Sequence, residues 1–417
     1  MDEARKQRGA VIAAEKQIRK TIGGYLVPSQ SGRGKYAVIV EGDTKPSCTC
    51  PDHELHGQAC KHIWAVKIVI QQEFDFANGT VTETVSVTKA VRRTYVQNWP
   101  AYNRAQTTEG DLFPALLRDL CRGIAEPERQ QRGRPRAPLA DSVFCATLKV
   151  YSTLSTRRFM SDLRAAQEHG FIAKAPHHSS VFRYLEDPAL TPILHDLIVK
   201  SSLPLKAVEV DFAVDSSGFT SSRLESWFDH RYGNDSATPA RHHTWVKAHI
   251  MCGVKTNVVT AIEIHDRNAA DGKQLPALVQ STARNFATAE VSADKAYGSV
   301  RNADTIASVG GAPFIAFKRN ATGTQPGPSA WSKMFGYFTY RRAEFLAHYH
   351  KRSNVESTFS MIKRKFGDFV RSKTDVAMVN EVLAKVLCHN LVVLIHESFE
   401  LGIEPAFSAL DVPKEAV

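Results

Sequence analysis

The sequence has no run approaching twenty apolar residues, the length needed for a helix to cross a bilayer. Its first ten residues, MDEARKQRGA, lack the apolar core of a signal peptide. Cysteine is scarce, at seven residues among 417, and no internal repeat is present. These absences argue against a membrane protein, a secreted disulfide-framed domain and a repeat protein. We expect a cytoplasmic protein with two or three globular domains.

Acidic side chains are outnumbered by basic ones. The chain has 53 Lys and Arg residues against 43 Asp and Glu, a net charge of +10. An excess of this sign favours polyanionic partners, of which nucleic acid is the commonest. Many basic proteins bind no DNA, so charge alone does not decide the function.

The pattern of the sequence divides the chain into four segments. Residues 1–95 combine a strand pattern, a Cys/His cluster and a helical pattern, whereas residues 96–205 are mainly helical. Short apolar strands with helices between and after them fill residues 206–400, and residues 401–417 form a tail. Strands interspersed with helices predict an α/β domain for the third segment.

The helical segment contains a basic linker. In it, Arg132 and Arg134 belong to the sequence RGRPR, which resembles an AT-hook core and would place both side chains in a narrow A·T minor groove. A plain basic linker is the alternative. The helices after it, the first with Asp141 as the predicted N-cap, are candidates for reading DNA, although no decisive recognition motif is present.

Three of the seven cysteines lie in the stretch CTCPDHELHGQACKH. Together with a histidine they give the spacing Cys-x-Cys, nine residues, Cys-x-His, formed by Cys48, Cys50, Cys60 and His62. Three thiolates and an imidazole suit tetrahedral Zn²⁺, and four protein ligands leave no position for a substrate. We therefore predict a structural metal, with a loop of unpaired polar residues as the alternative. His53 and His56 are expected to be solvated.

The strand before this cluster and the helix after it complete a pattern that resembles the SWIM zinc finger. The resemblance implies a small zinc-binding module. SWIM modules are associated with DNA binding or protein interaction, often as accessories in transposases.

Two aspartates follow apolar strands in the third segment. Asp215 ends the strand in VEVDFAVDSSGF, and Asp294 ends the one in VSADKAYGS. A carboxylate at a strand end followed by a turn is accessible to a metal ion while the strand fixes its position. Asp211 shares a face with Asp215 and is its main rival.

A basic helix is predicted in YHKRSNVESTFSMIKRKFG. Its polar residues at spacings of three, four and seven face one way, namely Tyr349, Arg352, Glu356 and Lys363. Beside them runs an apolar stripe that would bury against a sheet, formed by Val355, Phe359, Ile362 and Phe366. A surface helix with an Arg/Glu pair is the alternative. Trp331, just upstream, is expected to be a packing aromatic instead of a base-stacking one.

This Tyr, Arg, Glu, Lys spacing, with the two aspartate motifs in order before it, resembles the signature of cut-and-paste bacterial insertion-sequence transposases with an RNase H-like core. The resemblance implies a mixed sheet flanked by helices. It makes Asp215, Asp294 and Glu356 the ligands of two Mg²⁺ ions, for which Mn²⁺ substitutes. Arg352 and Lys363 become contacts to phosphates of transposon ends, and Tyr349 a positioning residue.

The function implied is that of a DNA transposase, which cleaves insertion-sequence ends by Mg²⁺-dependent hydrolysis and joins the 3′-OH ends to target DNA. Its partners would be double-stranded DNA and a second copy of the chain bound to that DNA, in a prokaryotic cytoplasm at the nucleoid. Two alternatives stay open: an inactive transposase-derived DNA-binding or regulatory protein, and an RNase H-like nuclease without strand transfer.

Overall fold

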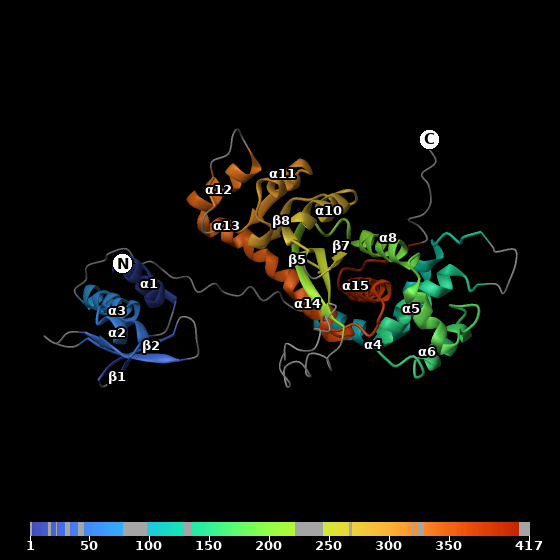
Figure 1. Cartoon of the computed structure of the whole chain (residues 1–417), viewed down its shortest axis with the longest axis horizontal. Helices are drawn as coiled ribbons and strands as arrows, with labels where there is room; N and C mark the ends of the chain where they lie inside the picture. Colours follow the sequence, from blue (N-terminus) through green and yellow to red (C-terminus); the bar gives the residue numbers. More distant parts are fainter. Residues whose placement is uncertain are drawn as a thin grey trace, which may run out of the picture. The chain divides into compact units, whose positions relative to one another are not determined.

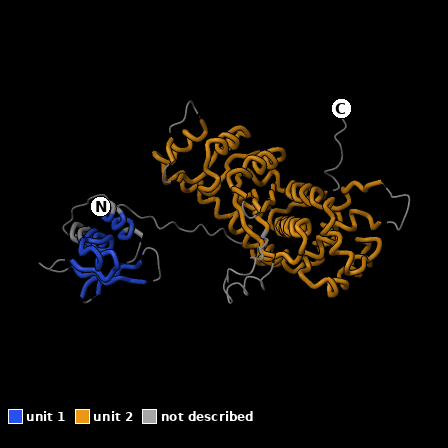
Figure 2. The backbone as a smooth tube through the Cα atoms, viewed as in Figure 1, with its two compact units in different colours: residues 1–96 blue, residues 97–417 orange. Residues whose placement is uncertain are grey.

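The computed structural model describes residues 2–15, 18–21, 23–29, 34–40, 46–77, 98–128, 136–221, 245–266, 269–318, 321–323 and 329–407. The chain forms two compact units, residues 1–96 and 97–417 (Figure 2). Arg132 and Arg134 lie outside the described residues, so their predicted contact with DNA stays a prediction.

The first unit is an antiparallel sheet covered by helices. Its elements are α1 (Asp2–Glu15), β1 (Arg19–Thr21), β2 (Gly24–Pro28), β3 (Lys35–Ile39), β4 (Ser47–Cys48), α2 (Pro51–His56) and α3 (Lys61–Ala77), with strand order β1-β2-β3-β4. Helices α1 and α3 approach closely at Gly9, where a Cβ atom would lie 2.6 Å from the Cβ of Trp64. Val27, Val38 and Ile63 fill the core of this unit.

The second unit begins with the predicted helices. These are α4 (Trp99–Arg122), α5 (Leu139–Ser152), α6 (Met160–Glu168), α7 (His178–Glu186) and α8 (Leu190–Ser202). The prediction that Asp141 caps a helix is wrong, because α5 starts earlier and Asp141 lies buried in its first turn. Its carboxylate binds the Arg118 guanidinium at 2.8 Å and accepts the Ala173 N–H at 3.1 Å. The side chain of Asp141 therefore takes part in a tertiary ion pair and does not cap the helix.

A mixed five-stranded sheet follows. The strands are β5 (Asp211–Thr220), β6 (Trp245–Gly253), β7 (Val259–His265), β8 (Glu290–Ala293) and β9 (Ala312–Ile315), in the order β7-β6-β5-β8-β9. Pairs within β5, β6 and β7 are antiparallel, while β8 is parallel to both β5 and β9. The remaining helices are α10 (Asp271–Ala283), α11 (Val300–Ser308), α12 (Ala330–Tyr340), α13 (Arg342–Tyr349), α14 (Ser353–Phe366) and α15 (Asp375–Glu400).

Strand β5 separates two apolar cores, because successive side chains of a strand point to opposite faces. Phe212 and Val214 belong to the core that includes α10 to α13. Ala213 and Phe219 belong to the other core, with α14, α15 and the helical region. The helical region and the sheet thus share a core within one compact unit.

Helix α15 is the central helix of the second unit and lies between the sheet and the helices of residues 99–202 (Figure 1). It is the one described helix long and apolar enough to cross a membrane, but 94% of its most apolar window is buried inside the protein. Asn390 fixes it to β7, because its side-chain amide accepts the Val259 N–H at 2.8 Å and donates to the Val259 carbonyl at 2.7 Å. In the predicted tail, Phe407 is buried and its N–H donates to Asp119.

Candidate metal centre and active site

The predicted zinc ligands converge in the first unit. Cys48 ends β4, Cys50 precedes α2, and Cys60 and His62 lie at the start of α3. The four ligand atoms lie within 4.8 Å of one another, and His62 Nδ1 is 3.8 Å from Cys48 Sγ and 3.9 Å from Cys60 Sγ. A tetrahedral ion with Zn–S bonds of about 2.3 Å needs ligand separations of roughly 3.7 Å. The donor set therefore fits Zn²⁺.

All four ligands are buried, with exposed fractions of 5% or less. Without an ion, the thiols cannot all ionise together. A hydrogen bond between Cys48 and Cys60 raises the pKa of Cys48 and lowers that of Cys60 to about 3, so the negative charge concentrates on one sulfur. A divalent cation would allow the remaining thiols to ionise as well.

The other two histidines of this stretch lie outside the cluster, as expected. The ring of His53 contacts the Gln58 carbonyl at 2.8 Å, and His56 is exposed beside Asp52. Neither is among the residues whose ligand atoms converge in the described part of the chain.

In the second unit, the odd-numbered residues of β5 face the basic helix. Asp215 shares its face with Ala213, which packs in the core that contains α14. Arg352 Nη1 lies 4.0 Å from Asp215 Oδ2 and 2.9 Å from Glu356 Oε1. The guanidinium therefore links a carboxylate of β5 to the helix carboxylate. The prediction that Asp215 ends its strand is wrong, because the residues after it stay paired with β6 as far as Thr220.

Asp294 belongs to the same electrostatic environment. It follows β8, the parallel neighbour of β5, and its side chain accepts the Lys295 N–H at 2.7 Å. The pKa of Asp215 lies above its usual value, mainly because the side chain is buried. The charges of Asp294 and Glu356 also raise this pKa, whereas the Ser216 N–H and Arg352 lower it. Asp294 and Glu356 thus act electrostatically on Asp215, although the three carboxylates are not among the described side chains whose ligand atoms converge within 4.8 Å.

The predicted basic helix is continuous in backbone conformation but built from three pieces. Tyr349 ends α13, a 3₁₀ turn spans His350–Arg352, and α14 begins at Ser353. The Arg352 guanidinium lies 5.7 Å from the centre of the Tyr349 ring. The apolar stripe predicted for α14 is confirmed, since all four of its residues are buried.

Basic side chains at both ends of this helix contact β5. Lys363 Nζ donates to Ser217 Oγ at 2.7 Å and to the Gly218 carbonyl at 2.8 Å. At the other end, Lys351 Nζ binds Asp211 and Glu290, each at 2.7 Å. Asp211, the rival of Asp215, is therefore neutralised by a lysine and a member of a separate ion-pair network.

Even-numbered residues of β5 face a second polar network, which the sequence did not reveal. Ser216 Oγ donates to Asp271 Oδ1 at 3.0 Å, and Lys247 Nζ lies 2.5 Å from the same oxygen. His249 Nδ1 is 3.6 Å from Asp271 and 3.4 Å from the Tyr297 hydroxyl. Burial lowers the pKa of His249 to about 4, which keeps the ring neutral. This network lies on the face of β5 opposite to Asp215 and contacts the strand at the neighbouring Ser216.

Trp331 is a packing residue in this structure. It is 7% exposed, its indole N–H donates to the Thr322 carbonyl at 2.8 Å, and its ring contacts Phe317 edge-on. It also borders a cavity of about 290 Å³ that includes Gly298 and Lys318. The first residues that line this cavity follow the Asp294 turn in the sequence.

These two sites coincide with two known families. Residues 206–391 match the transposase DDE domain. That match contains Asp215, Asp294 and Glu356, and it runs from β5 into α15 of this transposase domain. Residues 36–71 match the SWIM zinc finger, which includes all four buried zinc ligands. Searches of curated proteins and of solved structures gave no significant match.

The chain therefore contains a segment that matches the SWIM zinc finger, with a Cys/His cluster that fits a metal ion, and a mixed α/β segment that matches the transposase DDE domain. The transposase DDE domain implies a divalent metal ion and DNA as a partner. The narrower Tyr-Arg-Glu-Lys family and the roles of individual residues stay predictions.

Proposed function

We propose that the protein is an insertion-sequence transposase that cleaves the ends of its element by Mg²⁺-dependent phosphodiester hydrolysis and joins the 3′-OH ends to target DNA by transesterification. One observation carries this: Arg352 lies 4.0 Å from Asp215 on β5 and 2.9 Å from Glu356 on α14, and the charge of Asp294, which follows β8, acts on the same Asp215 carboxyl. The match to the transposase DDE domain supports the same reading.

The three carboxylates suit Mg²⁺, since hard cations prefer oxygen ligands. Burial is the main cause of the raised pKa of Asp215, and the charges of Asp294 and Glu356 add to it, so a bound cation would favour the ionised carboxylate. Two Mg²⁺ ions would supply an activated hydroxyl nucleophile and stabilise the leaving oxygen of the scissile phosphate. Asp215, Asp294 and Glu356 would hold them.

Arg352 would change partners during the reaction. In the structure its guanidinium neutralises Glu356 and lies near Asp215. Once cations occupy those carboxylates, the guanidinium becomes available to a DNA phosphate, for which its planar donors are well suited. Tyr349, beneath it, would hold its orientation. Lys363 would either keep its bonds to β5 and fix the helix, or exchange them for a phosphate.

The remaining parts follow from the same proposal. An RNase H-like core would carry the catalytic site, and residues 96–205 would contribute to DNA binding. Two transposon ends imply a homodimer on DNA in the cytoplasm of a prokaryote. The SWIM module would bind DNA or a protein partner.

The decisive assay uses purified protein, Mg²⁺ and a plasmid carrying the genomic segment that encodes this chain with its flanking DNA. We expect cleavage at the element ends and their joining to a target plasmid, both abolished by EDTA and by Asp294→Ala. Asp196→Ala, an exposed aspartate on α8, is the matched control and should leave both steps intact. EDTA-sensitive cleavage that survives Asp294→Ala would refute the site.

The same assay separates the alternatives. Specific DNA binding without cleavage would indicate a regulatory protein, and cleavage without joining would indicate a nuclease. The presence of all three carboxylates and the basic helix favours the transposase.

A further inference from the structure

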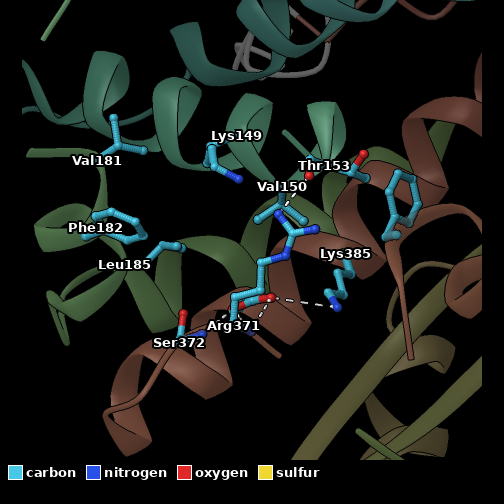
Figure 3. A pocket seen from close by; sticks show the side chains of 11 residues that line it. Lys149, Val150, Thr153, Val181, Phe182, Leu185, Arg371, Ser372 and Lys385 are labelled. Carbon is cyan, nitrogen blue, oxygen red and sulfur yellow. Dashed lines mark hydrogen bonds and ion pairs between the residues drawn. The ribbon is translucent and has the colours of Figure 1, made fainter. Parts of the chain in front are cut away.

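A small cavity lies away from the carboxylates, where the helical region meets the segment after α14. Its lining comes from α5, α7, the end of α14, the loop that follows and α15 (Figure 3). It has a volume of about 50 Å³, enough for roughly three or four water molecules. A group of that size would fit there.

The cavity has an excess of positive charge. Lys149, Arg371 and Lys385 line it, against a single carboxylate, Glu381. That carboxylate is already engaged: it accepts the backbone N–H groups of Arg371 and Ser372 at 2.9 to 3.1 Å and lies 3.7 Å from Lys385. Two cations are therefore left without a carboxylate partner among the cavity residues.

Lys149 is the more unusual of the two. It is 8% exposed, yet its ammonium makes no hydrogen bond or ion pair with the part of the chain that the structure describes. Its side chain extends toward the Arg371 guanidinium (Figure 3). Burial and the charge of Arg371 together lower the pKa of Lys149 to about 8. The Lys149 nitrogen is not among the fully buried polar atoms that lack a hydrogen-bond partner, so solvent reaches it and an anion can approach it from there.

Arg371 stands at the entrance. It is exposed, and its guanidinium donates to the backbone carbonyls of Thr153 and Leu154, at 2.7 and 3.4 Å, instead of to a carboxylate. The turn after α5 and helix α7 add exposed arginines to the same elements, namely Arg157, Arg158 and Arg183. An anion entering here would meet donors at the rim and at the base.

We propose that this cavity binds a phosphate group, held by Lys149 and Arg371 with Lys385 behind them. The phosphate belongs to the backbone of bound DNA, because the turn after α5 and helix α7, which contribute to the lining, carry further exposed arginines for neighbouring phosphates; free phosphate has the same chemistry and would enter the same place. The site is distinct from Asp215, Asp294 and Glu356. It would anchor DNA on the side of the helical region without taking part in cutting.

The first test needs no DNA end and no catalysis, so its result is independent of the proposed function. The melting temperature is measured in inorganic phosphate and in chloride of equal ionic strength. Phosphate should raise it by about 2 °C or more in the wild type, and have no effect on Lys149→Met. Lys273→Met, an exposed lysine on α10, should respond as the wild type does. In chloride, Lys149→Met should be at least as stable as the wild type, since it removes an unpaired buried cation.

The second test uses a random-sequence DNA duplex, because phosphate contacts do not depend on sequence. The slope of log affinity against log salt should fall by about 0.9 in Lys149→Met and in Arg371→Gln, the amount expected for one lost phosphate. A change in both tests, or in the salt slope alone, supports the backbone phosphate of DNA. A change in the phosphate test alone assigns the site to free phosphate. An equal response of wild type and Lys149→Met in both tests overturns the proposal.

Discussion

Arg352 lies between two acidic side chains of the candidate active site. Its guanidinium lies 2.9 Å from Glu356 and 4.0 Å from Asp215, while its own pKa is lowered by burial and raised above its usual value by Tyr349, Glu356 and Asp294. An arginine in this position acts as an internal counter-ion. It reduces the repulsion that would otherwise separate the carboxylates.

Replacing this counter-ion should make the site depend more on metal ions. We expect Arg352→Met to lower the free energy of unfolding by about 0.5–1 kcal/mol without Mg²⁺, a small effect because the pair is partly solvated. Added Mg²⁺ should then raise the melting temperature more in the variant than in the wild type. Arg341→Met, in the exposed pair with Glu344, is the control and should show the wild-type Mg²⁺ response. Equal Mg²⁺ responses would contradict the counter-ion role.

The lack of a carboxylate partner for Lys149 should make the free energy of unfolding depend on pH. Its pKa is lowered from 10.5 to about 8 by burial and by Arg371, with Glu381 raising it and Lys385 lowering it. Between these two pH values the unfolded chain binds more protons than the folded one, so the free energy of unfolding rises with pH. In phosphate-free buffer, the wild type should gain up to roughly 3 kcal/mol relative to Lys149→Met from pH 7.5 to 10.5. A pH-independent difference would contradict the unpaired state.

At the scale of elements, the zinc cluster joins β4 and α2, two short elements, to the longer helix α3, which packs against α1. We expect about one Zn²⁺ per chain in the wild type and almost none in Cys60→Ser, measured by elemental analysis. Loss of the metal should unfold the first unit, seen as a shift in the fluorescence of Trp64 on α3. His56→Ala keeps all four ligands and should retain both metal and fold. A metal-free protein with its N-terminal fold intact would refute the assignment.

Helix α14 carries Glu356 and is held to the helical region by one buried carboxylate. Glu109 on α4 accepts the Tyr151 hydroxyl at 2.6 Å and the Lys365 ammonium at 2.5 and 2.6 Å. Glu109→Gln should therefore lower the free energy of unfolding of the second unit by about 1–2 kcal/mol, because a charged partner loses its counter-ion. Glu168→Gln, an exposed residue on α6, should have no such effect in chemical denaturation. Equal stability of the two variants would show that the contact contributes little.

Local patterns predicted those parts of the sites that lie on one element. The zinc ligands and the buried stripe of α14 could be read from spacing, because neighbouring ligands and helical periodicity are encoded within short segments. The support of β5 could not be read in this way. Asp271 contacts Ser216 and His249 only after the strands and α10 have assembled. The spacing of these residues in the sequence therefore does not predict that they are neighbours. Asp141 was misassigned for the same reason, since its partner Arg118 lies on another helix.

At the scale of the whole molecule, the two units have separate apolar cores, one in residues 1–96 and the others in residues 97–417. Calorimetry should therefore show two transitions. A zinc chelator should abolish the transition of the first unit and leave that of the second within about 1 °C, as should Cys60→Ser. A single transition that shifts as a whole with the chelator would mean that the units fold together.

The sequence predicts a boundary near residue 95, because composition changes where the zinc module ends. The shared core of the helical region and the sheet could not be predicted in this way. Helices α5, α8 and α15 are apolar on surfaces whose partners lie far away in the chain, and periodicity shows that a face is buried without showing what covers it. The cavity beside Lys149 arises from the same long-range packing.

The central claim is that Asp215, Asp294 and Glu356 hold divalent cations together. The most direct measurement is the anomalous scattering of crystals soaked in Mn²⁺. We predict peaks between these three carboxylates, with oxygen ligands at about 2.1–2.2 Å, and their disappearance in Asp294→Ala. Mn²⁺ bound elsewhere, or no peak between the three side chains, would contradict the account.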